Sequence, residues 1–166
     1  MRVFLRLVVL GVIALCAGNC QRSNSDVGPL SVSVSSDMIC RANVPLKSND
    51  PPSENSCVRY TYEGDSLLMI KHLNAGFNCC PEKFAADIEV KGDSLIIRED
   101  DFKHGCKCNC QYNLDILVHN LPADLYHVRI AEPYAGKPES RLIFDLDLKK
   151  EKTGEFCVTR GEGWWR

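Results

Sequence analysis

Residues 77–121 constrain the fold more than any other part of the sequence, because they hold five of the ten cysteines. These are Cys79, Cys80, Cys106, Cys108 and Cys110. The chain opens with an export signal, so these thiols are expected to meet an oxidising compartment, where cysteines are paired, bound to metal or reactive. Which of the three applies decides which function the sequence supports.

The length and charge of the chain favour one exported domain without a nucleic-acid partner. The 166 residues leave room for a single domain with a real core once the export segment and a tail are removed. Removing the first 20 residues takes away Arg2 and Arg6, which leaves 18 basic against 22 acidic side chains. A nucleic-acid partner needs a concentrated basic face, and this mild acidity argues against one.

The N-terminus has the pattern of a lipoprotein signal peptide, predicted over residues 1–19. A basic start is followed by an apolar run over residues 7–15, which is too short to span a bilayer. The sequence Ala-Gly-Asn-Cys at 17–20 resembles a bacterial lipobox, although Asn19 departs from the usual small residue. We therefore predict lipidation at Cys20 and stable membrane anchoring, with simple secretion as the alternative.

The number of cysteines supports the same site. Cleavage before Cys20 and its lipidation leave an even set of eight downstream cysteines, whereas lipidation at Cys16 leaves nine. Cys16 also follows the bulky Leu15, which suits a lipobox less well. The eight disulfide candidates are Cys40, Cys57, Cys79, Cys80, Cys106, Cys108, Cys110 and Cys157.

Residues 20–56 are predicted to be the lipidated N-terminus and a flexible tether. They are rich in Ser, Asn, Asp and Pro, a composition typical of linkers. Apolar and polar residues alternate over residues 30–34, which can add one strand, and Cys40 indicates that the second half of the tether is tied down.

Residues 57–166 are predicted to form an all-β domain. Two hairpins are expected, at residues 58–70 and 88–97, because each has strand-forming residues on both sides of a Gly-Asp pair that suits a tight turn. Further strands are expected at residues 112–119, 126–131, 142–148 and 155–160. No helix-period stretch of useful length is present, so the pattern predicts an antiparallel β-sandwich stapled by disulfides.

The cysteine triplet favours disulfides over a metal site. On an extended strand Cys106 and Cys110 would stand about 13 Å apart, whereas thiolates around one zinc ion lie about 3.8 Å apart. We predict that at least two cysteines of the triplet form disulfides with Cys79 or Cys80 among their partners, and that Cys157 pairs with Cys57 or Cys40. A metal site, redox catalysis and a strained Cys79–Cys80 bond remain alternatives, and the absence of C-x-x-C weakens the redox reading.

One corner of the sequence resembles a known fold family. Leu121-Pro122-x-x-x-Tyr126-x-Val128 is similar to a segment of fibronectin-III and immunoglobulin-like domains. The resemblance implies an immunoglobulin-like sandwich with a tyrosine corner, in which the hydroxyl of Tyr126 bonds back to the preceding loop. It implies nothing about function.

A wider resemblance covers roughly residues 73–166. Asn-Cys-Cys-Pro at 78–81, the C-x-C-x-C triplet before Tyr112, the Leu-Pro corner and Cys157-Val158-x-Arg160 resemble a group of uncharacterised exported bacterial lipoproteins. The resemblance implies the bacterial cell envelope, with the domain facing the periplasm or the cell surface. It supplies no activity and no functional residues.

Other candidate residues carry weaker signals. His72, His104, His119 and His127 lack the spacing of a metal pair, so each is interpreted as an ordinary surface or strand histidine. The acidic run at 99–101 lacks the oxygen pattern of a calcium loop and is interpreted as a solvated turn. Trp164 and Trp165 are a weak binding candidate for a sugar or a partner, and we favour a role in covering one end of the sandwich.

The sequence contains no recognised catalytic frame and no phosphate loop, so no enzymatic activity and no cofactor are predicted. The expected function is that of a lipid-anchored, non-enzymatic binding or structural module of the envelope, with another envelope protein or a glycan as partner. The alternative is a metal-binding protein that uses the clustered cysteines.

Overall fold

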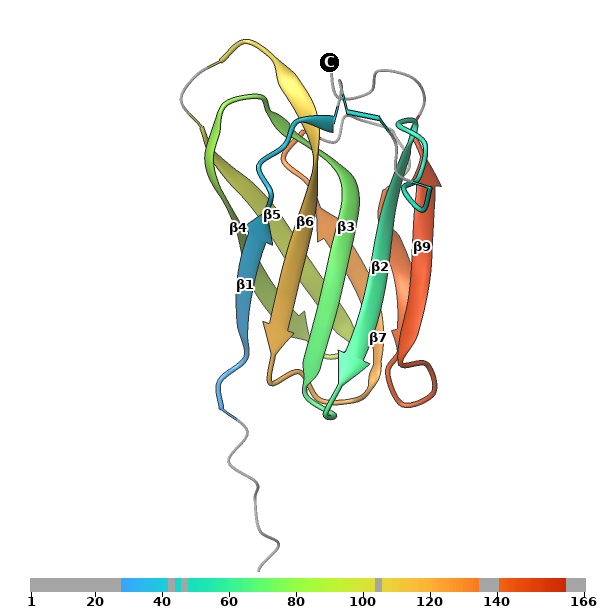
Figure 1. Cartoon of the computed structure of the whole chain (residues 1–166). Helices are drawn as coiled ribbons and strands as arrows, with labels where there is room; N and C mark the ends of the chain where they lie inside the picture. The colour runs from blue at the N-terminus through green and yellow to red at the C-terminus, as the bar shows by residue number, and fades with distance from the viewer. Residues whose placement is uncertain (1–27, 42–43, 46–47, 104–105, 135–140, 161–166) are drawn as a thin grey trace, which may run out of the picture.

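The computed structural model describes residues 28–41, 44–45, 48–103, 106–134 and 141–160. Within these ranges the chain forms nine β-strands and no α-helix, and the strands pack as two facing sheets (Figure 1). The strands are β1 (Ser31–Ser36), β2 (Asn55–Glu63), β3 (Leu67–Asn78), β4 (Pro81–Lys91), β5 (Ser94–Lys103), β6 (Asn109–His119), β7 (Leu125–Ala131), β8 (Ile143–Asp147) and β9 (Thr153–Thr159). The sheets have the orders β1-β6-β3-β2-β9 and β4-β5-β7-β8. The predicted β-sandwich is confirmed.

Both predicted hairpins are present, and their turns have the expected chemistry. The β2–β3 turn has positive φ at Gly64 (55°) and at Asp65 (54°), and the β4–β5 turn has positive φ at Gly92 (60°). Residues with positive φ give a turn whose twist matches that of the flanking strands. The Gly-Asp pairs therefore set the register of the two longest hairpins.

One strand pair departs from the purely antiparallel sandwich that the sequence predicted. β5 and β7 are parallel, with Ser94 opposite His127 and Arg98 opposite Ala131. Between them the chain crosses to the other sheet as β6 and then returns. Two reversals of direction bring β7 back along β5 in the same direction, so the four-stranded sheet is mixed.

The folded domain begins earlier than residue 57, which corrects the predicted tether of residues 20–56. β1 pairs with β6 from Ser31 opposite His119 to Ser36 opposite Leu114, so the alternating segment does form a strand. The first residues of β2 pair with β9, beginning with Asn55 opposite Thr159.

A bulge in β3 changes which side chains face the interior. The register between β3 and β6 shifts between His72 and Ala75, and Asn74 has a positive φ of 59°. His72 and Phe77 are both buried, although their positions differ by five and a regular strand would place them on opposite faces. The Asn74 side chain donates to the carbonyl oxygens of Pro51, Pro52 and Asn55 at 3.3, 3.1 and 2.9 Å, which fixes the segment before β2.

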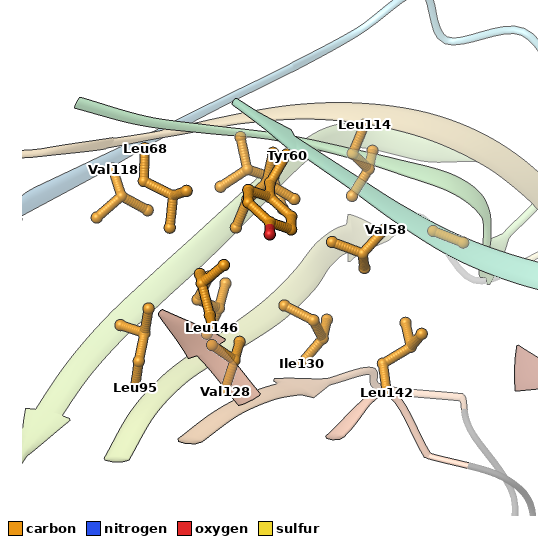
Figure 2. Packing of buried hydrophobic residues seen from close by; sticks show 14 of the residues in the cluster. Val58, Tyr60, Leu68, Leu95, Leu114, Val118, Val128, Ile130, Leu142 and Leu146 are labelled. Atoms are coloured by element: carbon orange, nitrogen blue, oxygen red, sulfur yellow. The ribbon is translucent and has the colours of Figure 1, made fainter. Parts of the chain in front are cut away.

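The core lies between the two sheets and is largely aliphatic, with a group of three packed aromatic rings at one end. Figure 2 shows side chains of the five-stranded sheet facing those of the four-stranded sheet. The labelled residues are Val58, Tyr60, Leu68, Leu114 and Val118 opposite Leu95, Val128, Ile130, Leu142 and Leu146. Phe84 packs between Phe77 and Tyr112, with ring centroids at 4.8 and 5.1 Å. Burying this apolar surface is the main stabilising contribution to such a sandwich.

Two tyrosines fasten the loop between β6 and β7. The Tyr126 hydroxyl donates to the carbonyl oxygen of Pro122 at 2.9 Å, which is the hydrogen bond expected from the corner sequence. From the other sheet, the Tyr62 hydroxyl donates to the carbonyl oxygen of Leu121 at 2.7 Å. The loop is therefore held from both sheets.

Candidate functional site

The eight cysteines that the structure describes form four disulfides. The pairs are Cys40–Cys110, Cys57–Cys157, Cys79–Cys108 and Cys80–Cys106. The predicted stapling by disulfides is confirmed, and two members of the triplet, Cys106 and Cys108, pair with Cys80 and Cys79. Such a framework indicates that the chain folds in an oxidising, extracellular compartment.

The cysteine triplet lies mostly in the segment that leads into β6. Cys106 and Cys108 precede β6, and only Cys110 lies within it. The sulfurs of Cys79, Cys80 and Cys106 gather within 4.8 Å of one another, but all are bonded to other sulfurs. The bridged state therefore offers no thiolate for the alternative reading of metal binding through clustered cysteines.

Three bridges share one end of the sandwich, which we call the disulfide end. It is the end where β3 turns into β4 and β5 leads to β6, and it includes Cys40 after β1. The opposite end, where β1 begins beside the last residue of β6, is called the tail end. The two ends are separated by the length of the strands (Figure 1).

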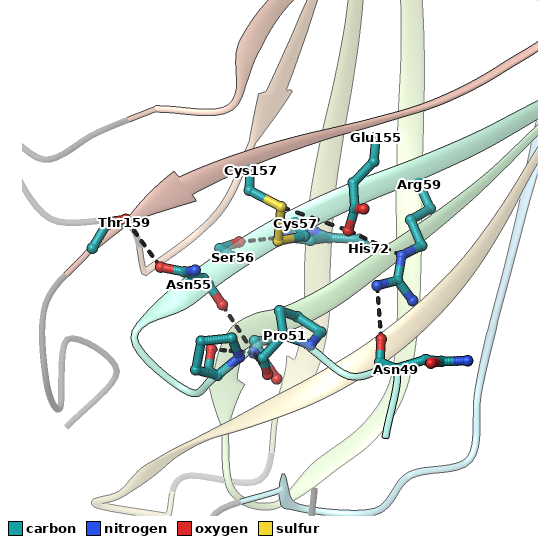
Figure 3. The surroundings of a disulfide bond; sticks show 12 residues. Asn49, Pro51, Asn55, Ser56, Cys57, Arg59, His72, Glu155, Cys157 and Thr159 are labelled. Atoms are coloured by element: carbon teal, nitrogen blue, oxygen red, sulfur yellow. Dashed lines mark hydrogen bonds and ion pairs between the residues drawn. A yellow bond between two sulfur atoms is a disulfide. The ribbon is translucent and has the colours of Figure 1, made fainter. Parts of the chain in front are cut away.

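A group of buried polar side chains lies between the sheets near the disulfide end. Figure 3 shows Ser56 and His72 beside the Cys57–Cys157 bridge. The Ser56 hydroxyl lies 2.9 Å from Nε2 of His72, and Oε1 of Glu99 lies 2.7 Å from Nδ1. The side chains of His72 and Glu99 have no exposed surface. These groups come from β2, β3 and β5, so they link the two sheets.

Two further charged groups complete this buried cluster. Glu132, just after β7, places Oε1 3.6 Å from Nε2 of His72, and its side chain is 2% exposed. Oε2 of Glu132 forms an ion pair with Arg160, which follows β9 and is also buried. Oε2 of Glu99 and Oε1 of Glu132 have no hydrogen-bond donor although both are buried. Such unpaired carboxylate oxygens are unfavourable in a protein interior.

Burial and charge act on the cluster in opposite directions. Burial lowers the pKa of His72, but the carboxylates of Glu99 and Glu132 outweigh burial and raise this pKa above its ordinary value. Burial raises the pKa of Glu132, and the opposing charges of His72 and Arg160 only partly compensate. The carboxylates thus need a positive charge beside them.

Ser56, His72 and Glu99 have the connectivity of a nucleophile, a base and an orienting carboxylate. Ser56 is fully buried, however, and a substrate cannot reach its hydroxyl in this structure. The chemistry available to the cluster is therefore to hold a proton or a cation between the sheets.

Neither the cluster nor the burial of the acidic run was predicted from the sequence. Residues 99–101 form part of β5 rather than a solvated turn, and Glu99 and Asp101 are buried. His72 was interpreted as an ordinary strand histidine, whereas it is the centre of the cluster. A signal was present, because Glu99 and Asp101 continue the alternation of Leu95 and Ile97 along one face.

The remaining predicted residues are not part of this cluster. His119 lies on β6 and His127 on β7, in different sheets, and His127 is paired with Asp145 on the surface. Cys20, His104, Trp164 and Trp165 lie outside the described residues. Tyr126 lies at the tail end beside a hollow of about 450 Å³, which is lined by apolar residues such as Leu30, Val90 and Leu125.

Comparison of the chain with models of protein families, with curated proteins and with solved structures gives no match. Within the ranges that the structure describes, no segment is an apolar helix long enough to cross a membrane.

Proposed function

We propose that the protein is a lipid-anchored, non-enzymatic envelope protein that binds another envelope protein through its disulfide end. The observation that carries this proposal is that the chain enters β1 at the opposite end. Ser31 is paired with His119, the last residue of β6, whereas the bridges of Cys106 and Cys108 precede its first residue, Asn109.

The anchor and the strand length set the orientation in this proposal. Ten residues between a lipid on Cys20 and Leu30 reach at most about 35 Å from the membrane. β6 has 11 residues, and a strand of that length spans about 36 Å. The tail end then faces the bilayer, and the disulfide end is presented away from it.

The disulfide end carries exposed apolar side chains on a rigid support. Met38, Ile39 and Phe102 are 42%, 46% and 46% exposed. Met38 and Ile39 directly precede the bridged Cys40, and Phe102 lies at the end of β5, near the two adjacent bridges. Exposed apolar groups mark protein contact sites, and segments fixed by covalent bridges lose little conformational entropy on binding.

The closed Ser56–His72–Glu99 arrangement supports a binding role over a catalytic one. Hydrolysis needs a nucleophile that can approach the substrate, and the Ser56 side chain is enclosed between the sheets. The proposed partner surface instead lies on the outside of the same end.

The proposal is tested by photo-crosslinking in the native host. A photoreactive amino acid is placed at Met38 or Phe102 of the lipid-anchored protein, and at Leu125 as the matched control. Leu125 is 52% exposed but lies at the tail end. We expect a discrete, protease-sensitive adduct from the first two positions and not from Leu125. Equal adducts from all three positions, or an adduct sensitive only to glycan cleavage, would contradict it.

A further inference from the structure

We propose that Nε2 of His72 and Oε1 of Glu132 bind one divalent transition-metal ion, with Glu99 orienting His72 and zinc as the ion to test. This inference is independent of membrane anchoring and of the partner surface. The three residues come from β3, from β5 and from the residue after β7, so the ion would join the two sheets. One ligand atom from each residue lies within 4.8 Å of the others.

The spacing of two ligand atoms fits a metal better than a hydrogen bond. Nε2 of His72 and Oε1 of Glu132 are 3.6 Å apart, which is too long for a hydrogen bond. With metal–ligand bonds of about 2.0–2.1 Å, neighbouring ligands of a tetrahedral site are about 3.3–3.4 Å apart. Oε1 of Glu132 has no hydrogen-bond donor, as expected for an atom that faces an ion.

Neighbouring side chains orient Nε2 of His72 and Oε1 of Glu132, as outer-shell groups orient the ligands in metal sites. Glu99 accepts from Nδ1 of His72, so Nε2 carries the lone pair, and an ion there would replace the hydrogen bond from the Ser56 hydroxyl. Arg160 occupies Oε2 of Glu132 and so leaves Oε1 for the ion. The Ser56 hydroxyl, 2.9 Å from Nε2, is an oxygen that could then turn to the ion.

The buried charge favours a cation beside His72. Glu99 and Glu132 are buried there, and Arg160 is the buried guanidinium that contacts them through Glu132. These three groups sum to a charge of −1 when His72 is neutral. Asp101 is also buried but is held by its own donors, the Asn78 amide and the Tyr134 hydroxyl. Imidazole nitrogen with carboxylate oxygen is a donor set that suits zinc and its neighbours.

The test is refolding with and without metal. The site is enclosed, so an ion is expected to enter during folding. The full mature chain is unfolded in guanidinium with a chelator under non-reducing conditions, then refolded with or without zinc and passed through a desalting column. We expect about one zinc per chain by elemental analysis and a higher melting temperature with zinc. Cobalt in place of zinc is expected to give the visible absorption of a tetrahedral site.

Variants separate this site from adventitious binding. His72→Gln and Glu132→Gln are expected to weaken zinc binding by at least about tenfold. His127→Gln is the control, because His127 forms a similar His–Asp pair on the surface, and it should retain the zinc. Far-UV circular dichroism and a disulfide map verify that each variant folds. If neither site variant folds, the zinc content and the cobalt spectrum of the wild-type chain decide whether the metal site exists. The proposal is overturned if the wild-type chain holds no metal after refolding with zinc. It is also overturned if His127→Gln loses as much zinc as His72→Gln and Glu132→Gln do.

Discussion

Cys57 and Cys157 face each other directly across β2 and β9, with their Cα atoms 4.1 Å apart. This close spacing is that of a non-hydrogen-bonded antiparallel pair, where opposed side chains approach most closely. The bridge joins residues 100 positions apart in the chain and ties the last strand to the body of the five-stranded sheet. Its separation of 100 positions exceeds those of the bridges at the disulfide end, which are 70, 29 and 26.

The first prediction compares two bridges that close loops of different length. The Cys80–Cys106 bridge spans 26 positions and Cys57–Cys157 spans 100. In the chain-entropy model, replacing both cysteines by serine lowers the free energy of unfolding by about 3.5 kcal/mol for the first pair and by about 4.7 kcal/mol for the second. Urea unfolding of the two double variants under non-reducing conditions measures the difference. The opposite order would show that native-state packing, and not loop length, sets the contribution.

The sequence could predict features that depend on neighbouring residues. Gly64 and Gly92 identify both hairpin turns because turn geometry is local. The Tyr126 hydrogen bond reaches back four residues and follows from the corner sequence alone. For Cys157 the sequence left two possible partners, Cys57 and Cys40. The reason is that the sequence indicates contact between the first and last strands of the domain but not their register.

Features that depend on register and on the second sheet could not be predicted. The bulge at Asn74 brings Ala75 and Phe77 onto the inner face that His72 already occupies, and no residue pattern along β3 predicts it. Glu99 and Glu132 reach His72 from the other sheet, 27 and 60 positions away in the chain. Charged residues are rarely buried without partners, so an acidic run reads as solvated until those partners are known.

The second prediction concerns Tyr62 at high pH. Burial raises the pKa of Tyr62 to about 12, with Asp65 and Tyr126 adding to the effect. A tyrosine ionises near pH 10 in the unfolded chain, before Tyr62 ionises in the folded chain. The contribution of Tyr62 to stability is therefore complete below pH 10 and is lost as the pH rises toward 12. The wild-type unfolding midpoint in urea should therefore fall more steeply between pH 10 and 11.5 than that of Tyr62→Phe.

Tyr62→Phe also removes the hydrogen bond to the Leu121 carbonyl oxygen. At pH 7 the variant should be less stable by about 1–2 kcal/mol, because a buried acceptor loses its donor. Tyr126→Phe provides a comparison, since its hydroxyl serves the neighbouring carbonyl oxygen of Pro122. Parallel pH profiles for the wild type and Tyr62→Phe would contradict the assignment.

The third prediction separates the two roles of Asn74, which are a positive φ and a side chain that donates to three carbonyl oxygens. Asn74→Ala loses the hydrogen bonds and strains the backbone, and should cost about 2–4 kcal/mol. Asn74→Gly keeps a relaxed backbone and loses only the hydrogen bonds, and should cost about 1–2 kcal/mol. Thermal unfolding of both variants measures the difference. Equal losses would show that the bulge stores no backbone strain.

The last prediction concerns Cys20 and the membrane. Every cysteine from Cys40 to Cys157 is bonded to another within the domain. None of these is left as a partner for Cys20, which is therefore available for lipidation in the proposed lipobox.

Two or three acyl chains on Cys20 would give stable anchoring, and their loss should release the domain. Cys20→Ser, expressed in the native host, should move from the membrane fraction to the soluble exported fraction while keeping all four disulfides. Cys16→Ser is the matched control and should stay in the membrane fraction, because Leu15 before it suits a lipobox poorly. A Cys20→Ser variant that stays wholly in the membrane fraction would show that anchoring has another origin, and release by Cys16→Ser alone would move the lipid to that residue.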